Sequence, residues 1–168
     1  MSRPAPRLLI AAAALLLATT ALAVRPSFKL EGQELILPSP IAFAEGTDTL
    51  SPESEAALEY VKAYLTEKSY ISQMRVEGHV AGAGAKDQAL SEKRALAVAR
   101  WLASHGVDCG RLVAVGFGNT RPVADPGTPE GRARNNRVAF FNAALKGRPI
   151  GGMPVDGGGK VAGDTCAK

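Results

Sequence analysis

The stretch that decides the fold runs from residue 76 to residue 95 and reads VEGHVAGAGAKDQALSEKRA. It begins inside an alternating apolar and polar segment, residues 74–80, which is typical of a half-buried strand. A loop of glycine and alanine follows, and the remainder has the composition of a charged helix. The stretch therefore predicts a strand, a connecting loop and a helix, with Asp87 as the N-cap of that helix.

The same kind of pattern continues on both sides of this stretch. Ser51 and Pro52 suit the start of an earlier helix, and His105-Gly106 suits the end of the later one. Short apolar segments predict further strands at residues 41–43, 111–117 and 137–141. The order strand, helix, strand, helix, strand, strand predicts an α+β sandwich in which two helices pack on one face of a mixed sheet.

The first residues have the composition of a secretory signal peptide. Arg3 and Arg7 precede the apolar run LLIAAAALLLA, and Ala21-Leu22-Ala23 fits the small-residue rule for cleavage after Ala23. An uncleaved membrane anchor is the alternative, although the run is short for a membrane span. The mature chain contains no other apolar stretch of that kind.

The remaining chain divides into three parts. Residues 24–40 are a lead-in segment and residues 41–145 form one domain, because about 145 residues correspond to one domain of ordinary size. From residue 146 to residue 168 glycine and proline dominate without periodicity, which predicts a flexible tail. Cys109 and Cys166 are the only cysteines, and in an exported protein a lone pair is typical of a disulfide.

Charge and motifs argue against several classes of function. Removal of two arginines with residues 1–23 lowers the formal charge from +4 to +2, and basic residues are not gathered into a stripe with aromatics, so we expect no nucleic-acid partner. The loop at Gly82 and Gly84 fails both the phosphate-loop and the dinucleotide patterns. His79 lies on the polar side of its strand and is interpreted as a surface histidine. We predict no catalytic residue, cofactor or metal.

Several blocks in order carry a family resemblance. IAFAEGTDTLSPESEAAL, VEGHV, ALSEKRALAVARWLASHGVD and LVAVGFGNTRPVADPGTPEGRARNNRV together span residues 41–138. The chain resembles the OmpA-like C-terminal domain, a periplasmic module that binds peptidoglycan. The resemblance implies a βαβαββ fold and a groove for the diaminopimelate residue of the wall's stem peptide, with an aspartate for its ammonium group and an arginine for its carboxylate.

These site residues carry over only in part. The L-S-x-x-R-A pattern is kept at residues 90–95, which places Arg94 at the carboxylate-binding position. Ala81 stands where the resemblance implies the aspartate, and Asn136 stands where it implies an arginine, while Arg137 remains. Asp87 could substitute for the missing acid if the loop at Gly82 brings it close, although a role as N-cap would compete.

Two hypotheses follow. The first is a non-enzymatic module that anchors to peptidoglycan through Arg94, with help from Asp87 or Arg137, in the periplasm of a Gram-negative-type envelope and in possible association with the outer membrane. The second is a structural or protein-interaction domain that has kept the fold and lost the wall ligand, because Ala81 and Asn136 both depart from the expected site. Outer-membrane or other envelope proteins are further expected partners.

Overall fold

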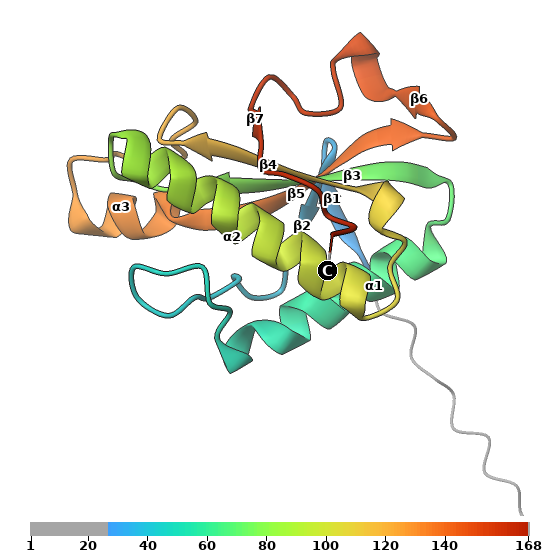
Figure 1. Ribbon diagram of the computed structural model, residues 1–168, viewed down its shortest axis with the longest axis horizontal. Helices are drawn as coiled ribbons and strands as arrows, with labels where there is room; N and C mark the ends of the chain where they lie inside the picture. The colour runs from blue at the N-terminus through green and yellow to red at the C-terminus, as the bar shows by residue number, and fades with distance from the viewer. Residues whose placement is uncertain (1–26, 168) are drawn as a thin grey trace, which may run out of the picture.

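The structure, a computed structural model, describes residues 27–167. The predicted signal peptide, residues 1–23, lies outside the described residues. Within residues 27–167, no helix is both long enough and apolar enough to span a bilayer. The main elements form one mixed sheet with helices packed against it (Figure 1).

The sheet has seven strands in the described part of the chain, and its order is β1-β2-β5-β3-β4-β7, with β6 paired to β5. β3 pairs in parallel with β4 and antiparallel with β5, so the sheet is mixed as predicted. The strands are β1 (Lys29–Glu31), β2 (Glu34–Ile36), β3 (Ile71–His79), β4 (Leu112–Gly118), β5 (Arg137–Leu145), β6 (Arg148–Pro149) and β7 (Lys160–Val161).

Two long helices, α1 (Glu55–Glu67) and α2 (Ala85–Ser104), lie on one side of the sheet (Figure 1). The C-terminal segment begins on the other side, passes the outer edge of β4 and ends beside α2 (Figure 1). The predicted α+β sandwich is therefore confirmed. The core between the layers is apolar because alternate residues of each strand point toward the helices. Its largest fully buried side chains include Tyr64, Phe140, Leu35, Leu58, Leu65, Ile71, Met74 and Leu102.

Some boundaries differ from the sequence prediction. Residues 41–43 form no strand, because Phe43 makes only an isolated bridge with Leu50. The first strands instead come from the lead-in segment, where β1 and β2 form a hairpin whose turn contains Gly32 at a φ of +60°. A third, short helix, α3 (Pro129–Asn135), occupies the predicted loop; Thr128 is its N-cap and accepts a hydrogen bond from the Gly131 N–H.

The C-terminal segment is ordered where a flexible tail was predicted. β6 pairs with β5, β7 pairs with the outer edge of β4, and the predicted disulfide joins Cys109 to Cys166. Two-residue strands held by backbone hydrogen bonds need no apolar periodicity, so the glycine-rich composition concealed them. Residues 146–167 are therefore part of the surface of the domain and do not form a flexible tail.

α2 approaches the sheet very closely at two glycines. A Cβ atom at Gly78 of β3 would lie 2.0 Å from the backbone oxygen of Ser91, and one at Gly116 of β4 would lie 2.4 Å from Cγ of Glu92. The Ser91 hydroxyl accepts a hydrogen bond from the Gly118 N–H at 3.0 Å and donates one to the Gln88 carbonyl at 2.7 Å. The helix is therefore fixed on the ends of β3 and β4 by contacts that only small side chains permit.

Substituting Gly78→Ala tests this contact. The added methyl group collides with backbone atoms of α2, so the helix must move, and we expect the free energy of unfolding to fall by about 1–3 kcal/mol or more. Gly110→Ala is the matched control, because Gly110 is exposed and a Cβ there would meet only the Asp108 carboxylate at 3.3 Å. Urea unfolding checks both; equal midpoints for the two variants would contradict the close packing.

Candidate binding site

An open groove lies at the start of α2, between the helix and the loop that precedes α1. The groove encloses about 580 Å³, a size typical of small-molecule sites. It carries both signs of charge, with two carboxylates and two ammonium groups. Its lining residues are Gly46, Thr47, Asp48, Lys86, Asp87, Ala89, Leu90 and Lys93.

Arg94 lies beside this groove in a fixed orientation. Its Nε donates a hydrogen bond to the Thr47 carbonyl at 2.8 Å, and its guanidinium carbon lies 4.8 Å from the centre of the Phe43 ring. Burial lowers the pKa of Arg94, and the nearby Asp48 carboxylate opposes that shift. Within the described chain the terminal amino groups of Arg94 have no hydrogen-bond partner, so they remain able to bind a carboxylate in the forked geometry that arginine favours.

The Asp87 carboxylate is not used as the helix cap. Gly84 occupies the N-cap position, and Asp87 lies in the first helical turn. Its carboxylate folds back over the preceding loop, where a Cβ at Gly82 would lie 2.5 Å from Oδ1. The predicted competition between capping and ligand binding is therefore wrong. Gly82 leaves space for the carboxylate, and the helix dipole favours a negative charge at this end.

Asp48 was not identified from the sequence. It follows Thr47 in a tight turn, in which the Thr47 N–H donates to the Ala44 carbonyl at 3.0 Å and the Ala44 N–H donates to the Thr49 carbonyl at 2.9 Å. The turn places the second acid of the groove opposite α2. The sequence signal is weak, because the segment EGTDT reads as an ordinary surface turn.

Arg137 and Ala81 do not line this groove. The terminal amino groups of Arg137 donate to the Arg121 carbonyl at 3.4 Å, and burial lowers the pKa of Arg137 while Glu34 and Glu77 oppose that shift. The Ala81 N–H donates to Oδ1 of Asn136 at 2.8 Å, so the two departures noted in the sequence contact each other.

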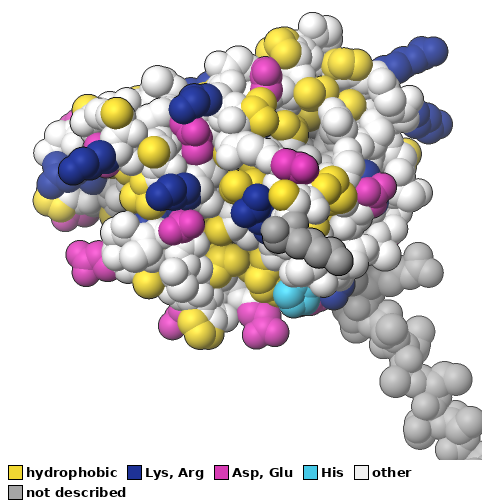
Figure 2. All heavy atoms as spheres, in the orientation of Figure 1, with side chains coloured by type: hydrophobic (Ala, Val, Ile, Leu, Met, Phe, Trp, Pro, Cys, Tyr) yellow, Lys and Arg dark blue, Asp and Glu magenta, His cyan; other side chains and the backbone are white. Residues whose placement is uncertain are grey.

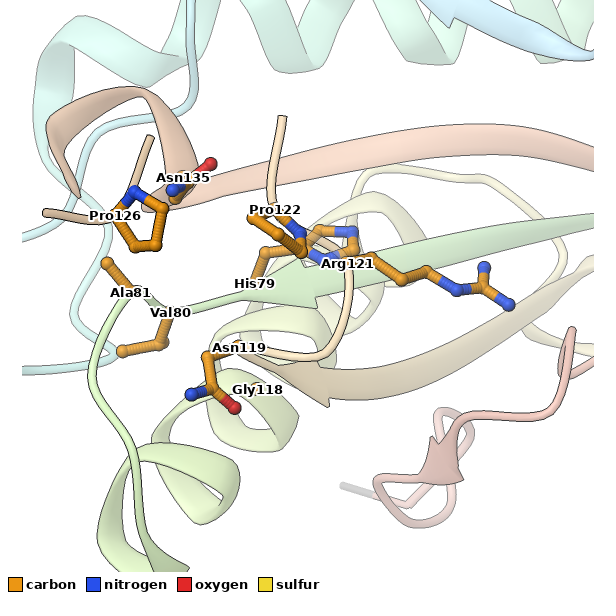
Figure 3. Close-up of a pocket in the computed structure, with 9 residues that line it drawn as sticks. All are labelled: His79, Val80, Ala81, Gly118, Asn119, Arg121, Pro122, Pro126 and Asn135. Carbon is orange, nitrogen blue, oxygen red and sulfur yellow. The ribbon is translucent and has the colours of Figure 1, made fainter. Parts of the chain in front are cut away.

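A second, much smaller cavity lies beside Ala81 (Figure 3). It encloses about 50 Å³ and has His79 in its wall. His79 is only 2% exposed, so the interpretation of a surface histidine is wrong. Its ring stacks on Phe117, and Nε2 lies 3.2 Å from Oε2 of Glu77. Other segments of the chain cover the polar face of β3 and bury His79. The alternation of residues within β3 alone cannot show that these segments lie there.

Glu77 connects His79 to Arg75 on the face of the sheet opposite the helices. Nε of Arg75 donates to Oε1 of Glu77, and all three side chains are nearly inaccessible to solvent. Burial lowers the pKa of His79, and the hydrogen bond to Glu77 only partly offsets this effect. Burial alone would raise the pKa of Glu77, but the hydrogen bonds from His79 and Arg75 outweigh it and lower that pKa.

The family follows from comparison with known proteins. A sequence model of the OmpA family matches residues 42–136, which is more than half of the chain. The chain belongs to the OmpA family. The OmpA-family match covers α1, β3, α2 and β4, and it therefore includes the groove, Arg94 and the small cavity.

Relatives and solved structures agree with membership of the OmpA family. The chain is 35% identical over 113 residues to the outer-membrane lipoprotein YfiB of Pseudomonas aeruginosa, covering 66% of this chain and 67% of YfiB. It is 54% identical over 66 residues to outer membrane porin F of the same organism, covering 38% of this chain but only 19% of the porin. The structure of the cell wall anchor of the T6SS from that organism superimposes with a TM-score of 0.56 at 29% identity, covering 69% of this chain and 85% of the anchor.

The buried histidine of this OmpA-family domain predicts a pH dependence of stability. Because its pKa in the folded state lies below the ordinary value of 6.5, the unfolded chain binds the proton more tightly. Stability is therefore fully present well above that value and falls as the pH drops from about 7.5 to about 5.5, at no more than about 1.4 kcal/mol per pH unit for one group.

Urea unfolding at about pH 7.5 and at about pH 5.5 measures this loss of stability, and the His79→Gln substitution should remove most of the loss. His105→Gln is the comparison variant, since His105 is exposed at the end of α2 and contacts Trp101, far in sequence from the Glu77–His79 pair. Below the ordinary value of 4.5, Glu77 should destabilise the fold further as it takes up a proton. A free energy of unfolding that does not change between about pH 7.5 and about pH 5.5 would contradict the buried neutral state of His79.

Proposed function

We propose that the protein is a non-enzymatic periplasmic module that binds peptidoglycan through the diaminopimelate residue of the stem peptide and links the cell wall to the outer envelope. The observation that carries the proposal is the pairing of an oriented Arg94 with an acid-lined groove at the start of α2. Membership of the OmpA family and the likeness to a cell wall anchor support it.

The free end of diaminopimelate carries a carboxylate and an ammonium group on one carbon atom. Arg94 is the partner of the carboxylate, because its Nε and the Phe43 ring already hold the guanidinium in place and little side-chain freedom is lost on binding. Asp87 and Asp48 are the partners of the ammonium group, since both carboxylates line the groove beside Arg94. The two acids together take the role of the aspartate that the family resemblance implies at the position of Ala81.

Lys86 and Lys93 also line the groove and bring positive charge close to the two acids. Both lysines are exposed, so solvent screens their effect on an ammonium ligand. They are suited to the other carboxylates of the stem peptide. Arg137, which lies outside the groove lining, acts at most through neighbouring residues and is not assigned a direct contact.

A second candidate function is a structural or protein-interaction domain that no longer binds the wall. The observation in its favour is Ala81, whose backbone N–H is engaged by Asn136 and whose side chain offers no charge. Under this alternative the groove charges are ordinary surface groups, which contribute little individually.

Sedimentation with isolated sacculi separates the two candidates. Losing one partner of a charge-assisted pair costs about 1.5–3 kcal/mol, so Arg94→Ala should weaken binding roughly tenfold to 150-fold. Asp87→Asn and Asp48→Asn should each weaken it less, because the other acid remains. Arg134→Ala is the matched control: Arg134 is exposed on α3, away from the groove lining, and the charge change is the same.

The substitution Ala81→Asp gives the opposite test. Strong binding by the Ala81→Asp variant and none by the unmodified protein would favour the second candidate. Equal binding by Arg94→Ala and the unmodified protein would exclude the proposed role of Arg94.

A further inference from the structure

Residues 155–166, here called the strap, wrap around the outer edge of the sheet. The strap starts on the face opposite the helices, pairs with β4 at that edge through β7, and then runs beside α2 to the disulfide at Cys166 (Figure 1). On the first face, Nη1 of Arg75 donates to the Val155 carbonyl at 3.2 Å, and Nη2 of Arg121 donates to the Gly157 carbonyl at 2.7 Å. The strap therefore contacts Arg75 of the buried cluster, and also Arg121, whose Nη1 lies 3.6 Å from Oε1 of Glu77.

The glycines of the strap fit the surface beneath them. Gly157 has a φ of +63°, and a Cβ atom there would lie 2.7 Å from the guanidinium carbon of Arg75. A Cβ atom at Gly159 would lie 2.4 Å from Cγ1 of Val115 and 2.6 Å from Cζ of Phe117. Gly157 and Gly159 thus lie in close contact with the sheet, whereas a Cβ atom at Gly158 would point into open space.

Beyond the sheet edge, the strap makes a short series of polar contacts. Nζ of Lys160 lies 3.0 Å from Oε1 of Glu92, and Nη2 of Arg100 donates to the Asp164 carbonyl at 3.1 Å. The Thr165 hydroxyl donates to the Cys109 carbonyl at 3.1 Å. The strap is joined to α2, the helix that also carries Arg94, at two separate points.

Few apolar side chains of the strap are buried. Thr165 is its one buried residue, Ala162 packs partly buried against the core, and Val161 remains 50% exposed. Four of the twelve strap residues are glycine, which lose the most conformational freedom on ordering. Little apolar burial offsets that loss, so the covalent link from Cys166 to Cys109 is the strongest single constraint on the strap.

We propose that the Cys109–Cys166 disulfide is a redox-controlled latch, and that the strap covers the β4 edge and the second face of the sheet only when the latch is closed. Closing transfers two electrons and two protons from the two thiols to an external disulfide oxidant, which leaves as a dithiol. Reduction by an external dithiol reverses the exchange. The open form leaves the β4 edge without its β7 partner.

Hydrogen exchange of the purified protein, followed by mass spectrometry, tests the latch. Comparing the oxidised protein with the same sample in excess dithiothreitol, we expect exchange in residues 155–163 to accelerate about tenfold or more. Residues of α1 and β3 should keep their protection, and trypsin should cleave faster after Lys160. Cys166→Ser should match the reduced sample without any reductant present.

Each other result overturns the proposal. Unchanged protection of the strap after reduction would show that its contacts suffice without the latch. Loss of protection throughout α1 and β3 would show that the disulfide supports the whole fold. Gly159→Val keeps both cysteines and adds a side chain where Val115 and Phe117 leave no space. This substitution should speed hydrogen exchange in residues 155–162 of the oxidised protein. Unchanged exchange protection there would contradict the close packing of the strap on β4.

Discussion

The contact between Ser91 and the two glycines of the sheet is the constraint on which the other features depend. Gly78 and Gly116 let the backbone of α2 approach β3 and β4, and the Ser91 hydroxyl then bonds to the Gly118 N–H. This contact fixes both the rotation and the position of α2 along the sheet. Asp87 lies one turn before Ser91 and Arg94 one turn after it, so both charged groups are positioned by the same contact.

The L-S-x-x-R-A pattern therefore has residues that pack against the sheet and, under the proposed function, one residue that binds the ligand. Ser91 and Ala95 are buried against the sheet, whereas Arg94 turns toward the loop before α1 and bonds to Thr47. The loop supplies Asp48 to the same groove. Under the proposed function, a ligand with one positive and one negative group would meet both partners on elements that are already ordered, which limits the entropy lost on binding.

Sequence patterns were sufficient for the parts of the fold that bury regular apolar surface. The stripe of Leu58, Val61 and Leu65 and the strands around Val76 and Phe140 lie in the core. Patterns failed where a third segment covers a polar residue or where backbone pairing replaces burial. His79 is buried although it alternates as a polar residue, and β7 pairs with β4 within a glycine-rich segment. The two failures have different causes, because the loop after β4 lies beside His79, whereas β7 is held by its backbone pairing with the edge of β4. In the candidate site, the motif was sufficient to single out Arg94, but the orientation of Asp87 and the presence of Asp48 depend on loop geometry.

An NMR titration compares two stem peptides that differ only at one residue, diaminopimelate in one and lysine in the other. Lysine keeps the ammonium group and lacks the neighbouring carboxylate, so it cannot pair with Arg94. We predict that the amide signals of Gly82, Asp87 and Arg94 shift with the diaminopimelate peptide, and that the lysine peptide binds about tenfold or more weakly. Equal affinity for the two peptides, or signals that do not move at roughly millimolar peptide, would contradict recognition of a zwitterion by Arg94 and the two acids.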